Sequence, residues 1–173
     1  MITIEQDIYN QISGEGNFEL FKSSDLTCCV LRMARGGNLN GYVGVNEKHP
    51  LYGKSYSDKI VVSKEKELQF NGNYIGLLCN DIDEVEAGLY SLDIAINVHG
   101  GLTYSEDSLK GLDEAITGKL WWFGFDTSHA WDISPYQTEI DRKFSFGDTD
   151  KEYRNFDYVK QQTISLAKQL TEL

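Results

Sequence analysis

The segment Leu120–Phe125 (LWWFGF) constrains the fold of this chain more than any other. Side chains alternate between the two faces of a strand, so Trp121 and Trp122 would point to opposite faces. A strand that is apolar on both faces has to be covered on both faces. The segment therefore predicts a strand in a central position of a sheet.

Other apolar runs predict the neighbouring strands. Leu26–Met33 (LTCCVLRM) and Gly41–Val45 (GYVGV) flank the turn-forming residues 35–38, a pattern typical of a hairpin. Leu89–Val98 (LYSLDIAINV) predicts a further strand that ends at a histidine and two glycines. The polar segments between these runs, residues 46–67, 107–118 and 133–150, are predicted to be loops.

Periodic apolar residues predict a helix at each end of the chain. Ile4, Ile8 and Ile12 recur at helical spacing, which indicates a short N-terminal helix. A similar periodicity over Tyr153–Leu170 predicts a C-terminal amphipathic helix packed on the sheet, with Asp150 as its N-cap. Together these elements predict an α+β fold with a mostly antiparallel sheet, as a single domain over residues 1–173.

The charge balance excludes one class of partner. The chain has 27 acidic residues against 16 Lys and Arg, a net charge of −11, whereas proteins that bind extended nucleic acid carry a basic face. A small phosphorylated ligand stays open, because one pocket needs only a few local donors. Lys54, Arg32 and Arg35 are the candidate phosphate contacts.

The apolar pattern also argues against a membrane partner. No apolar run approaches the roughly 20 residues that span a bilayer. The sequence begins Met1-Ile2-Thr3 and continues directly into acidic, polar residues, with no signal-peptide pattern. We therefore expect a cytoplasmic protein.

The cysteines indicate free thiols. There are three of them, and none is in a CxxC pair. Cys28 and Cys29 are adjacent in a predicted strand and would point to opposite faces. We expect buried free thiols rather than disulfides or metal ligands.

The three histidines of the chain fall one in each of three motifs, which is the strongest indication of a functional site. His49 lies in Leu39–Gly53 (LNGYVGVNEKHPLYG) and His99 in Val98–Ser105 (VHGGLTYS). The third histidine, His129, lies in WWFGFDTSHAWD, which ends at Asp132.

The motif around His99 suits a ligand contact. Gly100 and Gly101 allow positive φ angles, and successive backbone N–H groups in such a turn can bind an anion. His99 would contact the ligand or act as a general base, with hydroxyls from Thr103 and Tyr104. The alternative is a tight turn whose histidine caps a backbone carbonyl.

The motif that ends at Asp132 offers two kinds of chemistry. Trp122 and Trp131 could stack a planar ligand, or they could belong to the core. Asp126, His129 and Asp132 are spaced three residues apart and would share one face of a helical turn. With His99 or His49 they suit a zinc or manganese site. They also suit a histidine oriented by a carboxylate, for catalysis or for structure.

The motif around His49 suggests a lid. Pro50 restricts His49 to extended backbone, which would aim the imidazole reproducibly, and Tyr52 follows two residues later. Tyr42 precedes them on the predicted strand. The alternative is a surface loop with an incidental histidine.

These blocks together resemble a family of small proteins encoded by bacteriophages and prophages. The family pattern runs GYVGV–HPLYG, VHGGLTYS and WWFGFD–H–D, followed by a helix with a Y-R-x-x-x-Y-V-like entry, here Tyr153–Val159. The chain departs from it at Thr127, where the family often has Cys, and at Trp131, where Gly is common. The first departure weakens any proposal of a catalytic thiol at that position.

The resemblance implies a genetic setting in which small acidic proteins inhibit bacterial immunity. One such kind is a sponge that sequesters a nucleotide second messenger in the host cytoplasm, and sponges often form homo-oligomers. We therefore expect the chain to bind a small nucleotide-derived molecule with no cofactor; binding is favoured over catalysis, and the enzyme question stays open. The residues expected to line the site are Tyr42, His49, Tyr52, His99, Gly100, Gly101, Thr103, Tyr104, Trp122, Asp126, His129 and Asp132.

Two other functions stay open. One is a metal-dependent hydrolase or phosphodiesterase, with the metal at His99, Asp126, His129 and Asp132 and a bound water as the nucleophile. The other is a protein-binding or virion structural protein in which the motifs form only a shared core. The chain contains no Walker A sequence, no GxGxxG after a strand and no GxSxG elbow, so the sequence names no reaction.

Overall fold

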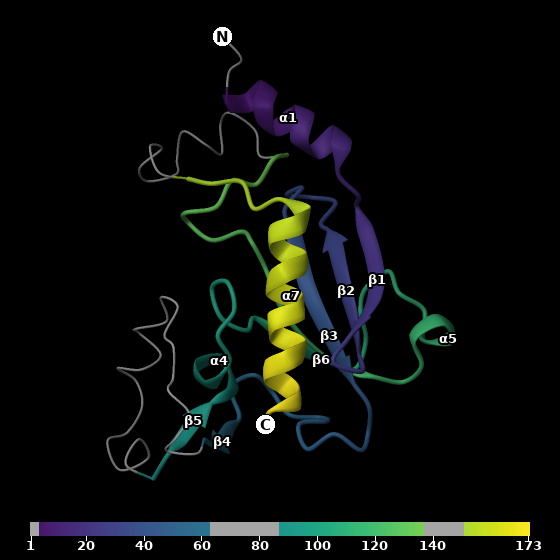
Figure 1. Cartoon of the computed structure of the whole chain (residues 1–173), viewed down its shortest axis with the longest axis vertical. Helices are drawn as coiled ribbons and strands as arrows, with labels where there is room; N and C mark the ends of the chain where they lie inside the picture. The colour runs from purple at the N-terminus through teal and green to yellow at the C-terminus, as the bar shows by residue number, and fades with distance from the viewer. Residues whose placement is uncertain (1–3, 63–86, 137–150) are drawn as a thin grey trace.

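A five-stranded antiparallel sheet is the centre of the computed structural model, which describes residues 4–62, 87–136 and 151–173 (Figure 1). The strand order is β1-β2-β3-β7-β6. The strands are β1 (Phe18–Ser23), β2 (Leu26–Arg32), β3 (Leu39–Val45), β7 (Trp121–Phe125) and β6 (Tyr104–Glu106). The predicted hairpin of β2 and β3 is confirmed, since Cys28 pairs with Val43.

Strand β7 has a neighbour on each side. Phe123 is paired with Val43 of β3 and with Ser105 of β6. The prediction of an interior strand is therefore confirmed. The side chains of β7 lie in two separate apolar clusters, one on each face of the sheet. Phe123 belongs to the larger cluster and Trp122 to the smaller.

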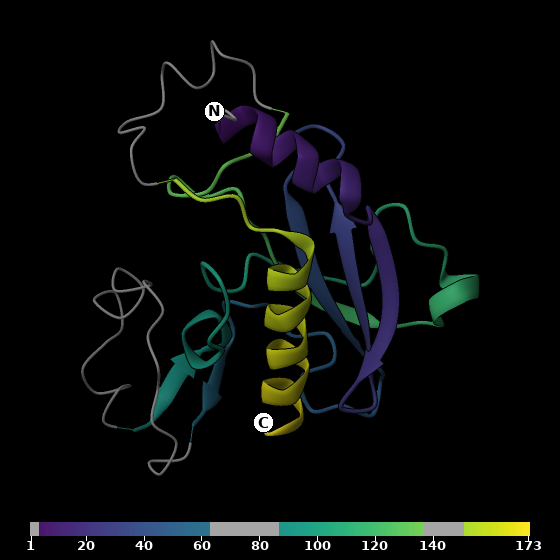
Figure 2. The ribbon, with the colours of Figure 1, turned by 45° about the horizontal axis from the view of Figure 1, so that its top comes forward.

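The C-terminal helix α7 (Phe156–Thr171) covers one face of the sheet (Figures 1 and 2). Its buried residues include Val159, Leu166 and Leu170, on the predicted apolar stripe. The helix comes close to β3 because Gly41 has no side chain there. A Cβ at position 41 would lie 2.2 Å from Oγ1 of Thr163.

The N-cap of α7 differs from the predicted one. The side chain of Asn155 accepts a hydrogen bond of 2.9 Å from the N–H of Tyr158, so the helix begins after Asn155. Asp150, the predicted cap, lies outside the described residues. Both residue types can cap a helix, and apolar periodicity does not choose between candidates a few residues apart.

The second face of the sheet is covered by the segment between β6 and β7. Leu109 and Leu120 from this segment pack with Cys29, Tyr42 and Trp122. The segment was predicted as a loop, and it contains the short helix α5 (Glu114–Thr117), capped by Asp113.

The predicted strand Leu89–Val98 is wrong beyond its first three residues. The strand β5 (Leu89–Ser91) pairs with β4 (Lys59–Val61), which lies in a segment predicted as a loop. The chain then turns into α4 (Leu92–Ala95), whose N–H groups at Leu92 and Asp93 bond to carbonyls of the 55–58 region. A short apolar run fits a buried helix as well as a strand, and here tertiary contacts decide.

The remaining elements agree with the predicted α+β class. Helix α1 (Ile4–Gly14) forms as predicted and leads to Glu15, which pairs with Arg32 at 2.8 Å. Cys28 and Cys29 are buried free thiols on opposite faces of β2, and burial raises their pKa values to about 11 and about 12. Cys79 lies outside the described residues.

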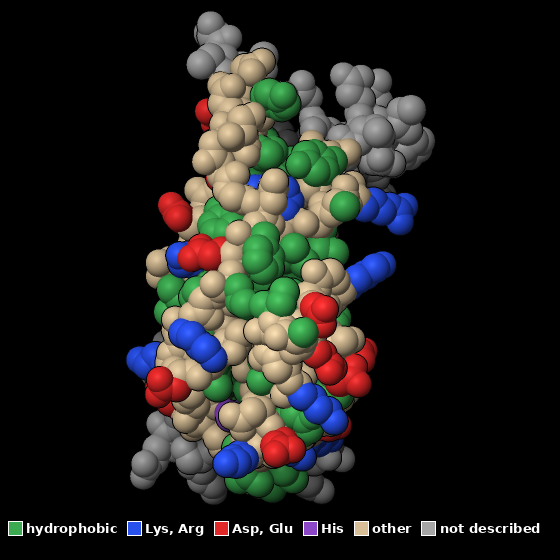
Figure 3. Space-filling model, turned by 90° about the vertical axis from the view of Figure 1, so that its right-hand side faces the viewer, with side chains coloured by type: hydrophobic (Ala, Val, Ile, Leu, Met, Phe, Trp, Pro, Cys, Tyr) green, Lys and Arg blue, Asp and Glu red, His purple; other side chains and the backbone are tan. Residues whose placement is uncertain are grey.

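Charged side chains of both signs are interspersed on one face of the molecule (Figure 3). On the face seen in Figure 3, Lys and Arg side chains lie scattered among acidic ones and form no continuous basic stripe. Among the described helices, none combines the length and the apolar character needed to cross a membrane.

Candidate functional site

The carboxylate of Asp132 is the centre of a buried cluster of hydrogen bonds. His99 Nε2 lies 2.8 Å from Oδ2, and His129 Nδ1 lies 3.2 Å from the same oxygen. The backbone N–H of His129 also donates to Oδ2, and Arg154 Nε donates to Oδ1 at 3.1 Å. The Asp132 side chain has no exposed surface, so these donors replace its water.

Three loops bring these residues together near the first turn of α7. His99 follows α4, Asp132 follows β7, and Arg154 precedes α7. A parallel bridge holds the second and third loops side by side, with Ile133 N–H donating to the Glu152 carbonyl at 3.0 Å. The three loops are distant in sequence, so their contact could not be predicted from the sequence.

Helix α7 fixes the orientation of His99. Tyr158 Oη lies 2.9 Å from Nδ1 of the ring, and the Gln162 side chain accepts the backbone N–H of His99 at 3.1 Å. Both helix residues were missed from the sequence. The signal was present, since positions 158 and 162 are polar residues beside the apolar stripe that packs on the sheet.

His129 is held between two partners. Its ring is stacked on Trp131, with centroids 4.9 Å apart and planes inclined by 7°. The edge of the His129 ring that carries Cε1 and Nε2 lies against Gly100. Gly100 has a positive φ of +66°, as predicted for this turn. Trp131 is 48% exposed, so this end of the cluster reaches the surface.

The electrostatics of the cluster define its protonation. Burial alone would raise the pKa of Asp132, but hydrogen bonds from His129, His99 and Arg154 hold that pKa well below its usual range. The hydrogen bond to Asp132 raises the pKa of His129 above its usual value, against the effect of burial. An ionised carboxylate only accepts hydrogen bonds. His99 Nε2 and His129 Nδ1 are therefore assigned as the protonated nitrogens.

Asp126 does not join this cluster. Its Oδ2 accepts from Thr103 Oγ1 at 2.9 Å, and its Oδ1 accepts from the N–H and hydroxyl of Ser128. Burial would raise the pKa of Asp126, but these hydrogen bonds and the nearby His129 lower it. The chain from Asp126 to Asp132 forms turns rather than a helix, so the three-residue spacing does not put the three side chains on one face.

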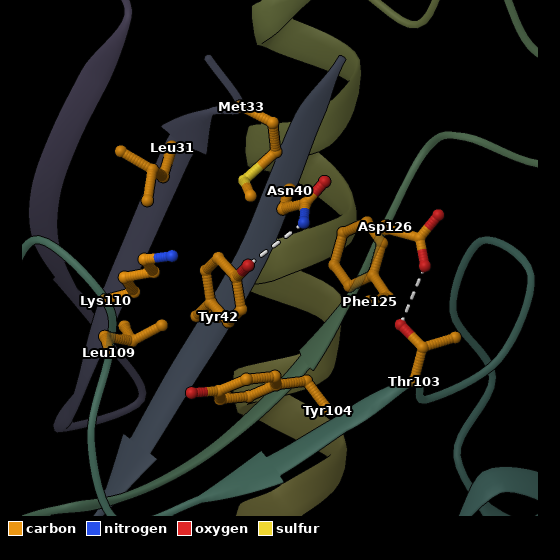
Figure 4. A pocket seen from close by; sticks show the side chains of 10 residues that line it. All are labelled: Leu31, Met33, Asn40, Tyr42, Thr103, Tyr104, Leu109, Lys110, Phe125 and Asp126. Carbon is orange, nitrogen blue, oxygen red and sulfur yellow. Dashed lines mark hydrogen bonds between the residues drawn. The ribbon is translucent and has the colours of Figure 1, made fainter. Parts of the chain in front are cut away.

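Thr103 and Asp126 instead line a pocket on the sheet face that points away from α7 (Figure 4). The cavity has a volume of about 310 Å³. Tyr42 and Tyr104 contact each other edge to face in its wall, with ring centroids 5.3 Å apart. The lining residues are Leu31, Met33, Asn40, Tyr42, Thr103, Tyr104, Leu109, Lys110, Phe125 and Asp126.

A ladder of polar side chains runs along β3 into this pocket. Asn38 Nδ2 donates to Asn40 Oδ1 at 2.8 Å, and Asn40 Nδ2 donates to the Tyr42 hydroxyl at 3.0 Å. Burial raises the pKa of Tyr42, so its hydroxyl stays protonated. Asn40 was not among the predicted site residues, although its place on the face of Tyr42, two residues away, follows from strand alternation.

The structure does not bring His49 and Tyr52 to either site. His49 Nε2 lies 3.1 Å from the carbonyl oxygen of Leu170, whereas His99 meets α7 at Tyr158. These two contacts are twelve positions apart along the helix, about 18 Å at 1.5 Å per residue. Tyr52 packs beside Trp121, with ring centroids 6.3 Å apart. Leu51 and Tyr52 of the HPLYG turn thus pack in the core at the far end of α7.

Two other predicted contacts are also placed elsewhere. Trp122 is 2% exposed and packs inside the smaller core cluster, so its ring offers no free face to a ligand. Arg32 is 8% exposed, and its guanidinium donates to Glu15, Tyr153 and the Gly37 carbonyl. Arg32 is therefore a buried structural cation.

Comparison with protein-family models, with curated proteins and with solved structures gives no match for this chain. Function therefore has to be inferred from the geometry of the pocket and of the cluster around Asp132.

Proposed function

We propose that the protein binds a small nucleotide-derived molecule in the pocket between Tyr42, Tyr104 and Asp126. The observation that carries this proposal is the pocket's combination of size and lining. Its volume of about 310 Å³ is at the lower end of the range for small-molecule sites. Such sites are mostly apolar and aromatic, with a few fixed polar groups that set the orientation of the ligand.

The polar groups of the pocket suit a heterocycle with both donors and acceptors. Asp126 is an ionised acceptor, already oriented by Thr103 and Ser128. The Tyr42 hydroxyl accepts from Asn40 and keeps its own hydrogen to donate. A base that carries an exocyclic amine next to a ring nitrogen or carbonyl would satisfy both groups.

The remaining groups suit the rest of a nucleotide. The edge strand β6 presents the ring of Tyr104 to the pocket, and contacts between aromatic side chains and bases stabilise binding by about 1–3 kcal/mol per base. The amine of Lys110 points toward the middle of the pocket and would pair with a phosphate (Figure 4). One local cation is consistent with a small ligand and with a strongly acidic chain.

The proposal includes a biological setting, the infection of a bacterium by a phage. The GYVGV–HPLYG, VHGGLTYS and WWFGFD–H–D blocks resemble those of bacteriophage and prophage proteins. A protein of that kind that retains a nucleotide without changing it would act as a sponge for a signal of host immunity.

A bind-and-release assay tests the proposal. The full chain is incubated with cyclic di- and trinucleotides and ADP-ribose derivatives, separated from excess compound and heat-denatured, and the released material is identified by mass spectrometry. We expect one intact compound. We expect Asp126→Asn to weaken its binding about 10- to 100-fold, since a hydrogen bond to a charged group contributes about 1.5–3 kcal/mol.

The matched control is His49→Gln, which changes a histidine at the far end of α7 and should retain the ligand. Retention of no compound from the panel would contradict the proposal, and so would equal binding by Asp126→Asn. Recovery of a cleaved product would favour a metal-dependent hydrolase instead.

A further inference from the structure

We propose that His99, His129 and Asp132 bind one divalent transition-metal ion of the zinc class. The site is separate from the pocket and does not depend on the proposed nucleotide binding. One ligand atom from each of the three residues lies within 4.8 Å of the other two. Two imidazoles and one carboxylate are a ligand set typical of zinc and of non-haem iron sites with open positions.

The distances fit coordination after a small adjustment. Bonds of about 2.0–2.2 Å in tetrahedral geometry put ligand atoms roughly 3.3–3.6 Å apart. Asp132 Oδ2 lies 2.8 Å from His99 Nε2 and 3.2 Å from His129 Nδ1. Each ring therefore has to move away from the carboxylate by a few tenths of an ångström, and the nitrogens of His99 and His129, which lie within 4.8 Å of each other, have to come to the same spacing by side-chain rotation.

The surroundings of the three residues match those of metal ligands. A metal-bound histidine usually donates its other ring N–H to an acceptor, and a bound carboxylate is held through its second oxygen. Tyr158 Oη lies 2.9 Å from His99 Nδ1, and Arg154 donates to Asp132 Oδ1. When His99 Nε2 and His129 Nδ1 give their lone pairs to the ion, both lose their hydrogens: that of His99 moves to Nδ1, where Tyr158 Oη accepts a hydrogen bond from it, and that of His129 is released to solvent.

The third ligand is positioned independently of these contacts. Trp131 stacks on one face of the His129 ring, and Gly100 leaves room for its edge. His129 is also the most exposed of the three ligands, at 19% of its side chain. The fourth coordination position would therefore face the surface beside Trp131, where a water or an anionic oxygen can bind.

Metal titration of the full chain, purified and dialysed without added metal, tests the site. We expect isothermal titration calorimetry with Zn²⁺ to show one equivalent. We expect NMR to show the ring nitrogens of His99 and His129 shifting on binding, while those of His49 stay unchanged. His129→Gln should weaken Zn²⁺ binding about 100-fold or more, because it removes a direct ligand.

Two variants serve as controls for the metal site. His49→Gln should bind Zn²⁺ like the wild type, which controls for the mere presence of a histidine. Asp126→Asn should keep the metal while losing the pocket ligand, so the two proposals can fail independently. Thermal melting confirms that each variant is folded.

The inference is overturned if Zn²⁺, Mn²⁺ and Co²⁺ all fail to bind. It is also overturned if folded His129→Gln binds Zn²⁺ as tightly as the wild type. Either result would leave the cluster as a network of hydrogen bonds around Asp132.

Discussion

Gly100 lies directly against the ring of His129: a Cβ at position 100 would be 2.1 Å from both Cε1 and Nε2 of that ring. The glycine thus has two roles. Its φ of +66° forms the turn after His99, and its missing side chain lets the two histidine rings approach to 5.3 Å between centroids. The position of the His129 ring therefore depends on this glycine.

Gly100→Ala is expected to displace His129 and to lower the stability of the protein. A left-handed alanine alone costs about 1–2 kcal/mol, and the clash adds to that. The matched control is Gly53→Ala. Gly53 also has a positive φ, +78°, but a Cβ added there would meet no atom within 4 Å. Urea unfolding should show the larger loss at position 100, and NMR should show a shifted His129 ring only there. Equal losses for the two variants would contradict the fit.

Asp132→Asn is expected to lower the pKa of His129, because the carboxylate that stabilises its charged form is gone. It should also destabilise the fold by about 1.5–3 kcal/mol, since the donors around Asp132 lose a charged acceptor, while Arg154 keeps its pair with Glu152. NMR titration of the ring measures the pKa. Asp126→Asn is the control and should lower the pKa less, because Asp126 makes no hydrogen bond to that ring. The reverse order would contradict the hydrogen-bond network around Asp132.

Gly41→Ala is expected to push α7 away from the sheet. The new Cβ would lie 2.2 Å from Thr163 Oγ1 and 2.5 Å from the Phe125 ring, both inside the core. Overpacking of this kind costs about 1–3 kcal/mol. The control is Gly16→Ala, whose Cβ would meet Phe156 at an ordinary 3.6 Å. Thermal melting should separate the two variants, and an unchanged melting temperature for Gly41→Ala would refute the close approach.

Arg32→Gln is expected to destabilise the protein by about 3–5 kcal/mol without changing ligand affinity, because its charge is buried and paired with Glu15. The double variant Arg32→Gln, Glu15→Gln should lose less than the sum of the two single losses. Chemical unfolding gives the stabilities and calorimetry the affinity. If folded Arg32→Gln bound the ligand more weakly than the wild type, Arg32 would contribute to ligand binding and this prediction would be wrong.

Acidification is expected to destabilise the protein through His49. Burial lowers the pKa of this imidazole in the folded state, although the Leu170 carbonyl partly opposes the shift. Below about pH 6.5 the unfolded chain binds a proton that the folded chain does not, so stability falls as pH drops. Melting temperatures of the wild type and His49→Gln, compared at pH 8 and pH 5.5, should show the wild type losing more. A pH-independent difference would show that His49 does not contribute.

The sequence by itself determined the elements whose residues repeat with a clear period. WWFGF had to be an interior strand because both of its faces are apolar, and the C-terminal repeat had to be a helix with one buried stripe. It also singled out His99, His129 and Asp132, whose side chains do meet in the structure. Periodicity and residue type are local properties, so they can be read before the chain folds.

Only the tertiary structure decided which of the predicted site residues contact one another. Leu92–Ala95 became a helix because carbonyls of the 55–58 region accept its first N–H groups. Asp126 accepts a hydrogen bond from Thr103 and does not contact His99, and His49 contacts Leu170 at the opposite end of α7. Hydrogen bonds between residues distant in sequence make these choices, and their partners are set by how the loops cross after the sheet and α7 have packed.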